Sequence, residues 1–410
     1  GAGKEGGRIV TQGTPLEAEK NPHSLIGPYL SGKESLKVRS RATEKDMFEN
    51  GSIRIKTKPF YTVKALDVSI PKGRMIAVTG VSGSGKTSLV IECLVPALQA
   101  VIQGTKLPEH VDSIEAKGIQ SVKVIDSKPI GANVRSTVAT YDGVFDDLRK
   151  LFARTADAKA KGLTAGDFSY NTGKLRCPVC DGTGIITMDV QFLPDVDTIC
   201  PSCGGSRYGK DAYDILWKSK EKDSVSVSLP GLLKLTVEEA AGILHEETKI
   251  AKQLKILQDL GVCYLTLGEA TPALSGGEAQ RLKLAYEMET PQQGSVFVFD
   301  EPTIGLHPQD VKKLVLIFDH LIQLGATVIV IEHDLELVTN CDYIIDMGPW
   351  GGTEGGRVVV EGTPEAVAAT SESITGRYLK QELAEDKKCS GKFRKKSFAV
   401  KHIFRKYQKI

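Results

Sequence analysis

Eight consecutive residues, Gly80 to Thr87, have the types and spacing that hold the phosphates of a nucleotide. Their sequence, GVSGSGKT, fits the pattern GxxxxGK followed by Ser or Thr, in which glycines let backbone N–H groups close around phosphates. The Lys86 ammonium would reach the β- and γ-phosphates, and the Thr87 hydroxyl would bind Mg²⁺. The alternative is a turn that only caps a helix. The predicted nucleotide ligands here are Gly80, Ser82, Gly83, Ser84, Gly85, Lys86, Thr87 and Ser88.

Two carboxylates and a histidine follow apolar runs further along the chain. Asp300 and Glu301 end the run Val296–Phe299, and His333 comes shortly after Ile329–Ile331. Phosphoryl transfer needs one group for the metal and one for the nucleophile, so Asp300 would hold Mg²⁺ through water and Glu301 would polarise the attacking water. His333 could contact the γ-phosphate. A surface acidic pair and a structural histidine are the competing interpretations. The predicted catalytic residues are Glu301, Lys86 and His333.

A Ser-Gly-Gly sequence precedes the helix-forming run LKLAYEM. Ser275 is a natural N-cap, and Gly276 and Gly277 would let a phosphate approach the helix N-terminus. An ordinary helix start is the competing interpretation.

Four cysteines form two CxxC pairs that are separated by 19 residues. This spacing predicts a closed four-thiolate Zn²⁺ site with Cys177, Cys180, Cys200 and Cys203, which is structural rather than catalytic. Disulfides are the competing interpretation. The remaining cysteines are scattered, and a chain of this size does not need disulfides, so we expect a reducing compartment.

The elements that must position these residues are short apolar strands and amphipathic helices. Strand, helix and strand follow one another near the C-terminal motifs, which predicts a parallel α/β core. The predicted strands are 74–79, 295–299 and 327–331, and the predicted helices are 87–98, 237–260 and 309–324.

Composition excludes several classes of protein. The 410 residues are 41% hydrophobic and 25% charged, which argues against a disordered or fibrous chain. The longest apolar runs are too short to cross a bilayer, and no secretory signal is visible, so we expect a cytoplasmic protein without a membrane partner. The net charge of +2 conceals an asymmetry. Residues 387–410 hold ten Lys and Arg and no acid, while residues 1–386 carry a charge of −8.

Residues 1–31 and 350–380 align without a gap at a fixed offset of 349. Identical pairs include Glu5 and Glu354, Gly6 and Gly355, Gly27 and Gly376, and Leu30 and Leu379. An internal repeat of this kind predicts the tail of one module followed by a second module of a tandem protein.

The order of phosphate loop, LSGGE signature, Asp-Glu strand end and strand-end histidine resembles that of ABC-type ATPases. The resemblance implies that ATP lies between two modules. Ser275, Gly276 and Gly277 would then complete the site of a second module, in the same or another chain. One departure is Ser127, which stands where the family usually has a Gln that contacts Mg²⁺. The candidates for the aromatic residue that stacks on adenine are Phe60 and Tyr61.

The separation of 189 positions between Lys86 and Ser275 is about twice that of a transporter module, so a mostly helical region with the zinc module is inserted. ABC motifs with such an insertion resemble the UvrA family. Stretches such as Pro129–Gly131, Ala139–Tyr141 and Phe192–Val196 extend the resemblance over residues 1–383. The predicted divisions are a preceding module's tail (1–36), a linker (37–50), core (51–100), insertion (101–265) with the zinc module (171–210), core (266–383) and a basic tail (384–410).

The UvrA resemblance implies an ATPase that recognises damaged duplex DNA in nucleotide excision repair and has no nuclease activity of its own. ATP, Mg²⁺ and Zn²⁺ are the implied cofactors. A UvrB-like partner would bind through the missing first module. Candidate DNA contacts flank the cysteines, although a solvated face is equally consistent: Lys174, Arg176, Arg207, Tyr208 and Lys210.

Three departures favour a divergent paralogue, of the kind associated with resistance to DNA-intercalating antibiotics. They are Ser127, the pair Thr137–Val138 where the family has Asn-Pro, and the basic tail. That tail could add nonspecific DNA affinity, or it could be a disordered extension or a frameshift artefact. Two further functions compete with these: a soluble ABC ATPase that does not act on DNA, and a DNA-binding scaffold without ATPase activity. The inserted CxxC pairs argue against the first, and intact Lys86 and Glu301 argue against the second.

Overall fold

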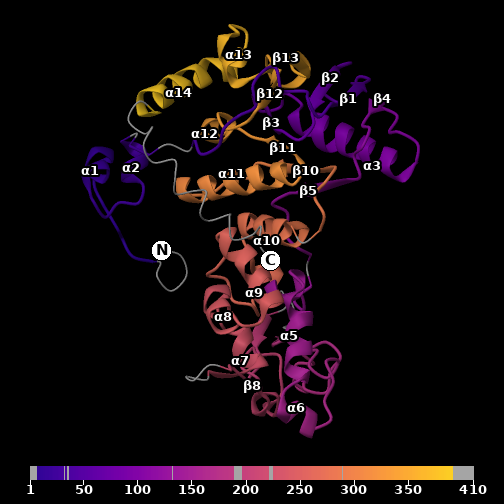
Figure 1. Cartoon of the computed structure of the whole chain (residues 1–410), viewed down its shortest axis with the longest axis vertical. Helices are drawn as coiled ribbons and strands as arrows, with labels where there is room; N and C mark the ends of the chain where they lie inside the picture. The colour runs from indigo at the N-terminus through magenta and orange to yellow at the C-terminus, as the bar shows by residue number, and fades with distance from the viewer. Residues whose placement is uncertain are drawn as a thin grey trace. The chain divides into compact units, whose positions relative to one another are not determined.

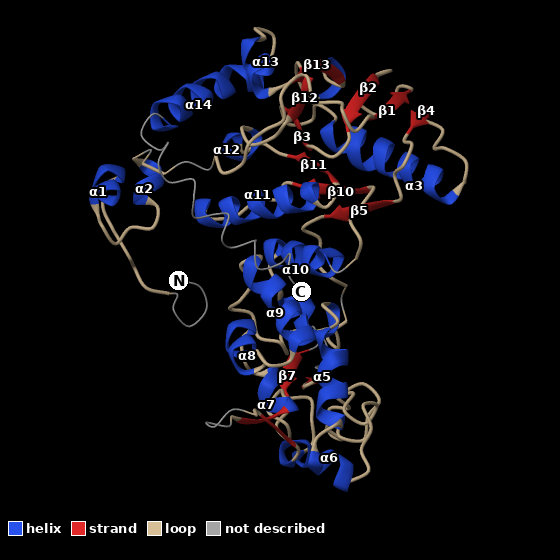
Figure 2. Cartoon of the chain, in the orientation of Figure 1, coloured by secondary structure: helices blue, strands red, loops and turns tan. Residues whose placement is uncertain are grey.

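The computed structural model describes residues 7–31, 33–34, 37–131, 133–188, 196–220, 225–288 and 290–390. The family stretch 192–195, the repeat pairs at Glu5 and Gly6, and the tail beyond residue 390 lie outside these residues. The chain divides into two compact units (Figures 1 and 2). One contains Ser127–Thr290, and the other contains Arg8–Asp126 and the residues from Pro291 onward. The first unit therefore begins and ends later in the sequence than the predicted insertion.

A six-stranded sheet forms the centre of the unit that contains the phosphate loop. Its strand order is β13-β12-β3-β11-β10-β5, and only β13 runs antiparallel to its neighbour. The three strands predicted from the sequence are β3, β10 and β11, so the predicted α/β fold is confirmed. The strands are β3 (Met75–Gly80), β5 (Ser121–Ile125), β10 (Ser295–Asp300), β11 (Thr327–Ile331), β12 (Tyr343–Gly348) and β13 (Arg357–Gly362).

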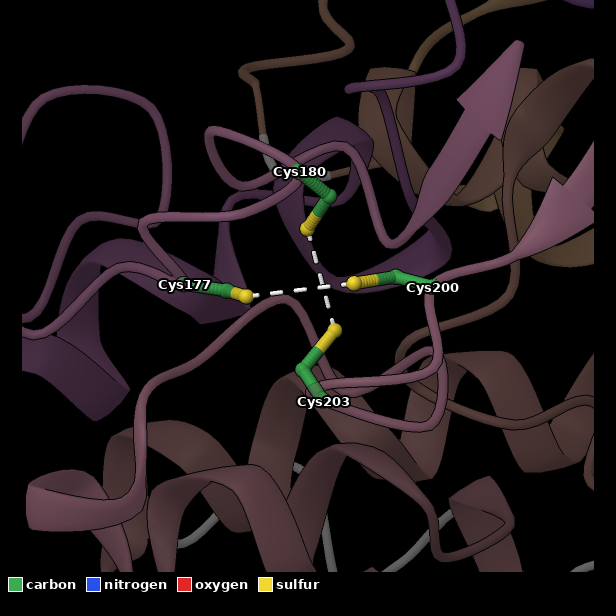
Figure 3. Close-up of side chains that lie close together, drawn as sticks. All are labelled: Cys177, Cys180, Cys200 and Cys203. Atoms are coloured by element: carbon green, nitrogen blue, oxygen red, sulfur yellow. Dashed lines mark hydrogen bonds between the residues drawn. The ribbon is translucent and has the colours of Figure 1, made fainter. Parts of the chain in front are cut away.

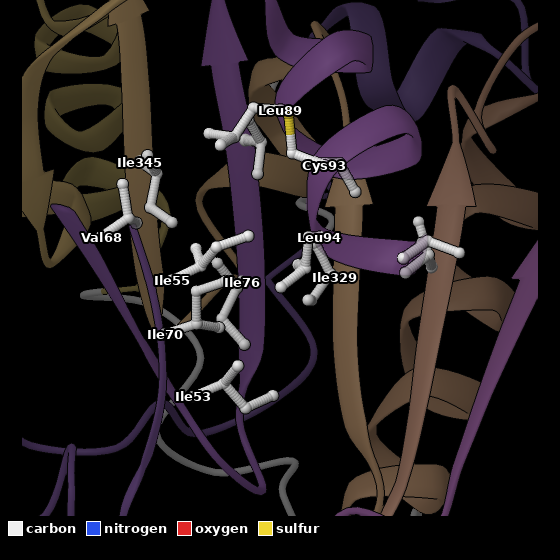
Figure 4. Close-up of a cluster of buried hydrophobic side chains, with 14 of the residues drawn as sticks. Ile53, Ile55, Val68, Ile70, Ile76, Leu89, Cys93, Leu94, Ile329 and Ile345 are labelled. Carbon is white, nitrogen blue, oxygen red and sulfur yellow. The ribbon is translucent and has the colours of Figure 1, made fainter. Parts of the chain in front are cut away.

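Side chains alternate between the two faces of a strand, and in this sheet both faces are buried under packed helices. Val296 and Val298 of β10 belong to the core that includes Leu94 and Leu98. Figure 4 shows Leu94 in this core, beside Ile329 of the neighbouring strand β11. Phe299 points to the other face, where its ring lies 4.4 Å from the ring of Phe318. The helix predicted over 87–98 is a π-helix, η2 (Ser88–Leu94), continued by α3 (Val95–Gln103), and Phe318 belongs to α11 (Pro308–Gln323).

A smaller antiparallel sheet extends the core on the side of η2. Its order is β2-β1-β4, with β1 (Ser52–Thr57), β2 (Asp67–Pro71) and β4 (Val111–Glu115). Ile53 and Ile55 of β1 and Val68 and Ile70 of β2 are buried in the same cluster as Ile76 of β3 (Figure 4). This packing fixes the strand that leads into the phosphate loop.

The internal repeat recurs in the local structure. Helix α1 (Pro15–Lys20) and helix α13 (Pro364–Ala369) stand at the offset of 349 and share a threonine N-cap. Gly27 and Gly376 begin or continue the next helix of each copy, α2 (Gly27–Leu30) and α14 (Ile374–Ser390). A Cβ at either glycine would press on the carbonyl oxygen of the equivalent residue, Ala18 or Val367. The two copies therefore need glycine for the same reason.

The segment 37–50, predicted as a linker, is anchored by an arginine. The Arg39 side chain is 5% exposed and forms ion pairs with Asp319 at 2.9 Å and with the fully buried Asp342 at 3.1 Å. Asp342 also accepts hydrogen bonds from the N–H groups of Ala42 and Met75. The segment is thus tied to β3 and α11.

We expect Arg39→Ala to lower the free energy of unfolding by about 3–5 kcal/mol, because Asp342 would keep a buried charge without its partner. Urea unfolding measures this difference. Arg41→Ala is the control, since Glu365, the partner of Arg41, has a half-exposed side chain and such pairs contribute about 0–1 kcal/mol. Equal losses in the two variants would contradict this account.

The unit that contains Ser127–Thr290 consists of helices and two short hairpins. The helix predicted over 237–260 is two helices, α8 (Val237–Ile243) and α9 (Thr248–Asp259). Between them, the Glu246 carboxylate accepts hydrogen bonds from the Ser219 hydroxyl and the Lys220 N–H, which ties this turn to a hairpin. The other described helices of this unit are α4 (Val138–Tyr141), α5 (Val144–Ala153), α6 (Ala156–Ala160), α7 (Leu229–Leu233) and α10 (Gly276–Met288), with two short 3-10 helices, η3 (Lys210–Asp214) and η4 (Thr271–Ala273). The hairpins are β6 (Ile185–Met188) with β7 (Val196–Ile199) and β8 (Leu216–Lys218) with β9 (Ser226–Ser228).

Within the described residues, no helix combines the length and apolarity needed to cross a membrane.

Candidate nucleotide and metal sites

The phosphate loop leaves the carboxyl end of β3 in a conformation that needs glycine. Gly80, Gly83 and Gly85 have φ values of +133°, +74° and +96°. A Cβ at Gly80 would clash with the Met347 carbonyl oxygen. The Ser84 hydroxyl is buried without a hydrogen-bond partner. A loop of this shape, with a lysine inside it, fits the phosphates of a nucleotide.

Lys86 lies inside the loop and is 6% exposed. Its ammonium donates hydrogen bonds to the carbonyl oxygens of Gly80 at 2.9 Å and Val81 at 3.0 Å. Burial lowers the pKa of Lys86, and the nearby carboxylates of Glu301, Asp346 and Asp300 oppose that shift. A phosphate would give the Lys86 ammonium an anionic partner, which binds it more strongly than the two neutral carbonyl oxygens do.

A glycine-rich segment that the sequence analysis did not assign holds the phosphate loop from outside. The N–H of Gly352 donates to the Gly83 carbonyl, and the N–H of Gly356 donates to the Ser84 carbonyl, both at 3.1 Å. A Cβ at Gly351 would lie 2.6 Å from the Ser82 carbonyl oxygen. The available signal was the repeated Gly-Gly pairs at 351–352 and 355–356, whose partners lie about 270 positions away in the sequence.

Asp300, Glu301 and His333 come together at the carboxyl ends of β10 and β11, of which β11 lies next to β3 and β10 lies next to β11. The distance from His333 Nε2 to Glu301 Oε1 is 3.7 Å. Glu301 has φ +47°, a left-handed conformation that is uncommon for a residue with a side chain. Ligand sites of parallel sheets lie at this edge, so the arrangement fits the predicted chemistry.

The signature residues lie in the other unit, at the start of α10. Ser275 caps the helix: the Glu278 N–H donates to its hydroxyl at 3.4 Å, and the Ser275 N–H donates to the Glu278 carboxylate at 2.7 Å. The predicted N-cap is therefore confirmed. Ser127 lies against this turn, because a Cβ at Gly276 would be 3.0 Å from the Ser127 carbonyl oxygen. Gly277 is the next residue of the helix.

The four cysteine sulfurs converge on one point (Figure 3). All four lie within 4.8 Å of one another, with Cys177 and Cys200 at 4.0 Å and Cys180 and Cys203 at 3.7 Å. Tetrahedral Zn²⁺ with Zn–S bonds of about 2.3 Å requires sulfurs about 3.8 Å apart. The Gly184 N–H donates to the Cys180 sulfur at 3.3 Å. The cysteines are not joined as disulfides, and the cluster fits zinc.

Burial raises the pKa of the Cys177 thiol, but hydrogen bonds from the N–H groups of Cys180 and Val179 outweigh it and lower the pKa to about 7. Burial raises the pKa of Cys203. The neighbouring sulfurs of Cys200 and Cys180 raise the pKa of Cys203 further.

Two of the candidate DNA contacts are wrong, because the side chains are buried. Arg207 is 7% exposed and donates to the Val134 carbonyl oxygen at 2.9 Å. Tyr208 is 1% exposed and donates to the Phe168 carbonyl oxygen at 2.6 Å. Lys174 has a well-exposed side chain, and Arg176 is partly exposed and pairs with Asp181 at 3.1 Å. Arg207 and Tyr208 therefore dock the cysteine loops within the unit, whereas Lys174 and Arg176 reach the surface.

The two candidate adenine contacts differ in their surroundings. The Phe60 ring stacks on His110 with a centroid distance of 3.9 Å. Tyr61 is 79% exposed and lies in the segment that adjoins Gly85 and Gly356. Tyr61 therefore has the ring face that a base could cover.

Comparisons with known proteins agree with the motifs. The chain is 43% identical over 393 residues to UvrABC system protein A of Staphylococcus aureus (strain COL), which covers 94% of this chain and 40% of that protein. It is 42% identical over 390 residues to UvrABC system protein A of Aquifex aeolicus (strain VF5), covering 94% of this chain and 41% of that protein. The crystal structure of UvrA2 from Deinococcus radiodurans matches with a TM-score of 0.83 and 38% identity, over 93% of this chain and 45% of that one.

The predicted resemblance to UvrA is therefore confirmed. The chain spans about two fifths of the length of the curated relatives it matches. No family model matches it.

Proposed function

Because the chain is a homologue of UvrABC system protein A over 94% of its length, we propose that it is an ABC-type ATPase of the UvrA kind. It binds damaged duplex DNA without reading its sequence, acts in nucleotide excision repair in the cytoplasm and cuts no DNA itself. The observation that carries the ATPase proposal is the meeting of Lys86, Glu301 and His333 at one edge of the sheet, with Glu301 and His333 3.7 Å apart.

In this proposal each residue has a separate task. The N–H groups of the phosphate loop and the Lys86 ammonium bind the β- and γ-phosphates, the Thr87 hydroxyl holds Mg²⁺, and Asp300 holds it through water. The metal neutralises charge that develops on the phosphates. Glu301 orients and polarises the attacking water, and His333 contacts the γ-phosphate. Tyr61 covers the adenine.

A second module completes the nucleotide site. Ser275, Gly276 and Gly277 form a helix N-terminus of the kind that binds anions, but they belong to the unit that does not hold the phosphate loop. We infer that they contact the ATP of another module, so that ATP controls the pairing of modules. A UvrB-like partner would bind outside the residues present here. Ser127, which lies against Gly276, would pass a change in nucleotide state to the signature turn.

The DNA proposal is tested by the affinity of the 410-residue chain for a duplex of about 50 base pairs with and without one bulky base adduct. We expect tighter binding to the adducted duplex, and log Kd that changes linearly with log salt, because Lys and Arg release counterions from phosphates. Fluorescence anisotropy over a salt series measures both. The control is Lys86→Ala, measured with and without ATP. It should remove any effect of ATP on DNA affinity but leave the dependence of log Kd on log salt unchanged. Absence of affinity at low salt would exclude this proposal and favour an ABC ATPase that does not act on DNA.

A divergent role in drug protection is the second candidate, favoured by Ser127 and by Thr137–Val138. Thr137 caps α4, and its hydroxyl lies 3.1 Å from the Tyr170 hydroxyl, so threonine serves as the N-cap where the family has Asn. Survival of a repair-deficient bacterium that expresses this chain separates the two roles. Protection against an intercalating antibiotic but not against ultraviolet light would favour drug protection.

A further inference from the structure

Glu332 is a buried glutamate that no motif assigned. It follows β11 directly and is 2% exposed. A carboxylate in such a place is expensive to bury unless its oxygens accept several hydrogen bonds. Glu332 meets this condition with four donors from two loops.

Each oxygen of Glu332 serves a different loop. Oε1 accepts from the N–H of Thr303 at 3.1 Å and from the Thr303 hydroxyl. Oε2 accepts from the N–H of His333 at 2.6 Å and from the N–H of Asp334 at 3.1 Å. Thr303 lies two residues after Glu301, so one side chain joins the loop that follows β10 to the loop that follows β11.

The joined loops carry the two groups that face each other across the site. Glu301 Oε1 lies 3.7 Å from His333 Nε2, and the Glu301 N–H donates to the Ile331 carbonyl oxygen at 2.9 Å. Glu301 also keeps φ +47°. An unfavourable backbone conformation persists only where the surroundings fix it, and Glu332 holds the loop on its C-terminal side.

We propose that Glu332 is a positioning residue that sets the separation of Glu301 and His333 without touching the substrate. This inference rests on the proposed ATPase function, in which both groups act on the γ-phosphate and its attacking water. An error of about 1 Å in such a pair can lower a rate about 10²-fold. Glu332 therefore acts on turnover, while the phosphate loop, which it does not hydrogen-bond, keeps its hold on the nucleotide.

The test is Glu332→Gln in the 410-residue chain. The amide presents its NH₂ to one loop, where at least one backbone N–H then faces another donor. The orientation that loses least puts the NH₂ toward Thr303, whose hydroxyl can accept from it, and keeps the amide oxygen for His333 and Asp334.

We expect kcat of Glu332→Gln to fall by about 10²-fold, with KM and the ATP Kd changed by no more than about twofold. Thr303→Val, which removes only the hydroxyl donor, should show the same split with a smaller fall in kcat. Thr303→Ser keeps both donors and is the matched control.

A rise in KM or in ATP Kd that accompanies the fall in kcat, or unchanged kcat in both variants, would overturn the positioning role. A crystal structure of Glu332→Gln gives a reading that does not depend on activity. An increased distance between Glu301 and His333 supports the proposal, and an unchanged distance contradicts it. Absence of ATP binding to the unaltered chain would reject the ATPase proposal instead, because turnover also depends on a second module, and the crystal structure would still decide the role of Glu332.

Discussion

Glu301→Gln is expected to slow ATP hydrolysis by about 10²–10⁴-fold while ATP binding is retained. Gln has the size of Glu and can still hydrogen-bond a water, but its amide cannot take a proton from it. The phosphate-binding groups are separate from Glu301: the Lys86 ammonium is held by the Gly80 and Val81 carbonyl oxygens, and the loop is held by Gly352 and Gly356. Single-turnover hydrolysis and equilibrium binding of ATP, measured on one preparation, provide the comparison.

Two controls make this result specific to Glu301. Lys86→Ala should lose ATP affinity as well as turnover, because it removes a charge that contacts the phosphates. Glu365→Gln changes an equally charged residue of the same unit, whose partner is Arg41, and should leave hydrolysis unaltered. Turnover by Glu301→Gln at the rate of the unaltered chain would show that another group polarises the water.

Local spacing explains why the chemical motifs could be predicted. The phosphate loop, the strand-end carboxylates and the two CxxC pairs each lie within a few residues, and the buried strands β3, β10 and β11 are uninterrupted apolar runs. The helix α11 was predicted within one residue at each end, since its apolar residues recur at helical spacing and His307 with Pro308 begin it.

The features that were not predicted depend on contacts between distant residues. Position 351 needs glycine because a side chain there would clash with the Ser82 carbonyl oxygen. Glu332 is held by hydrogen bonds from Thr303, which lies 29 positions away in the sequence. The charge of Arg207 is typical of a phosphate-binding residue, yet its side chain is buried against Val134, 73 positions earlier. The turn between α8 and α9 is likewise tied by Glu246 to Ser219 and Lys220, contacts that periodicity along the helix does not reveal.

The second large effect concerns the metal. Reduced protein is expected to contain one zinc per chain, and Cys200→Ala is expected to lose it, because three thiolates hold a structural Zn²⁺ far less tightly than four. Structural zinc contributes about 10–16 kcal/mol to zinc-finger peptides, which is as large as the usual stability of a whole domain of about 5–15 kcal/mol. The loops around Cys177 and Cys200 have few apolar residues of their own, so we expect them to unfold without the metal. Elemental analysis and limited proteolysis measure the two effects.

Cys341→Ala is the matched control, because Cys341 is as buried as Cys200 but lies outside the cluster. It should keep its zinc and resist protease at residues 171–210. The loops are also docked by protein contacts, since Arg135 donates to the Asp181 carbonyl oxygen at 2.8 Å and Arg207 donates to the Val134 carbonyl oxygen at 2.9 Å. If those contacts were sufficient, Cys200→Ala would lose zinc without new cleavage. Cleavage that appears only together with zinc loss would show that the metal folds the loops and that the arginines dock them afterwards.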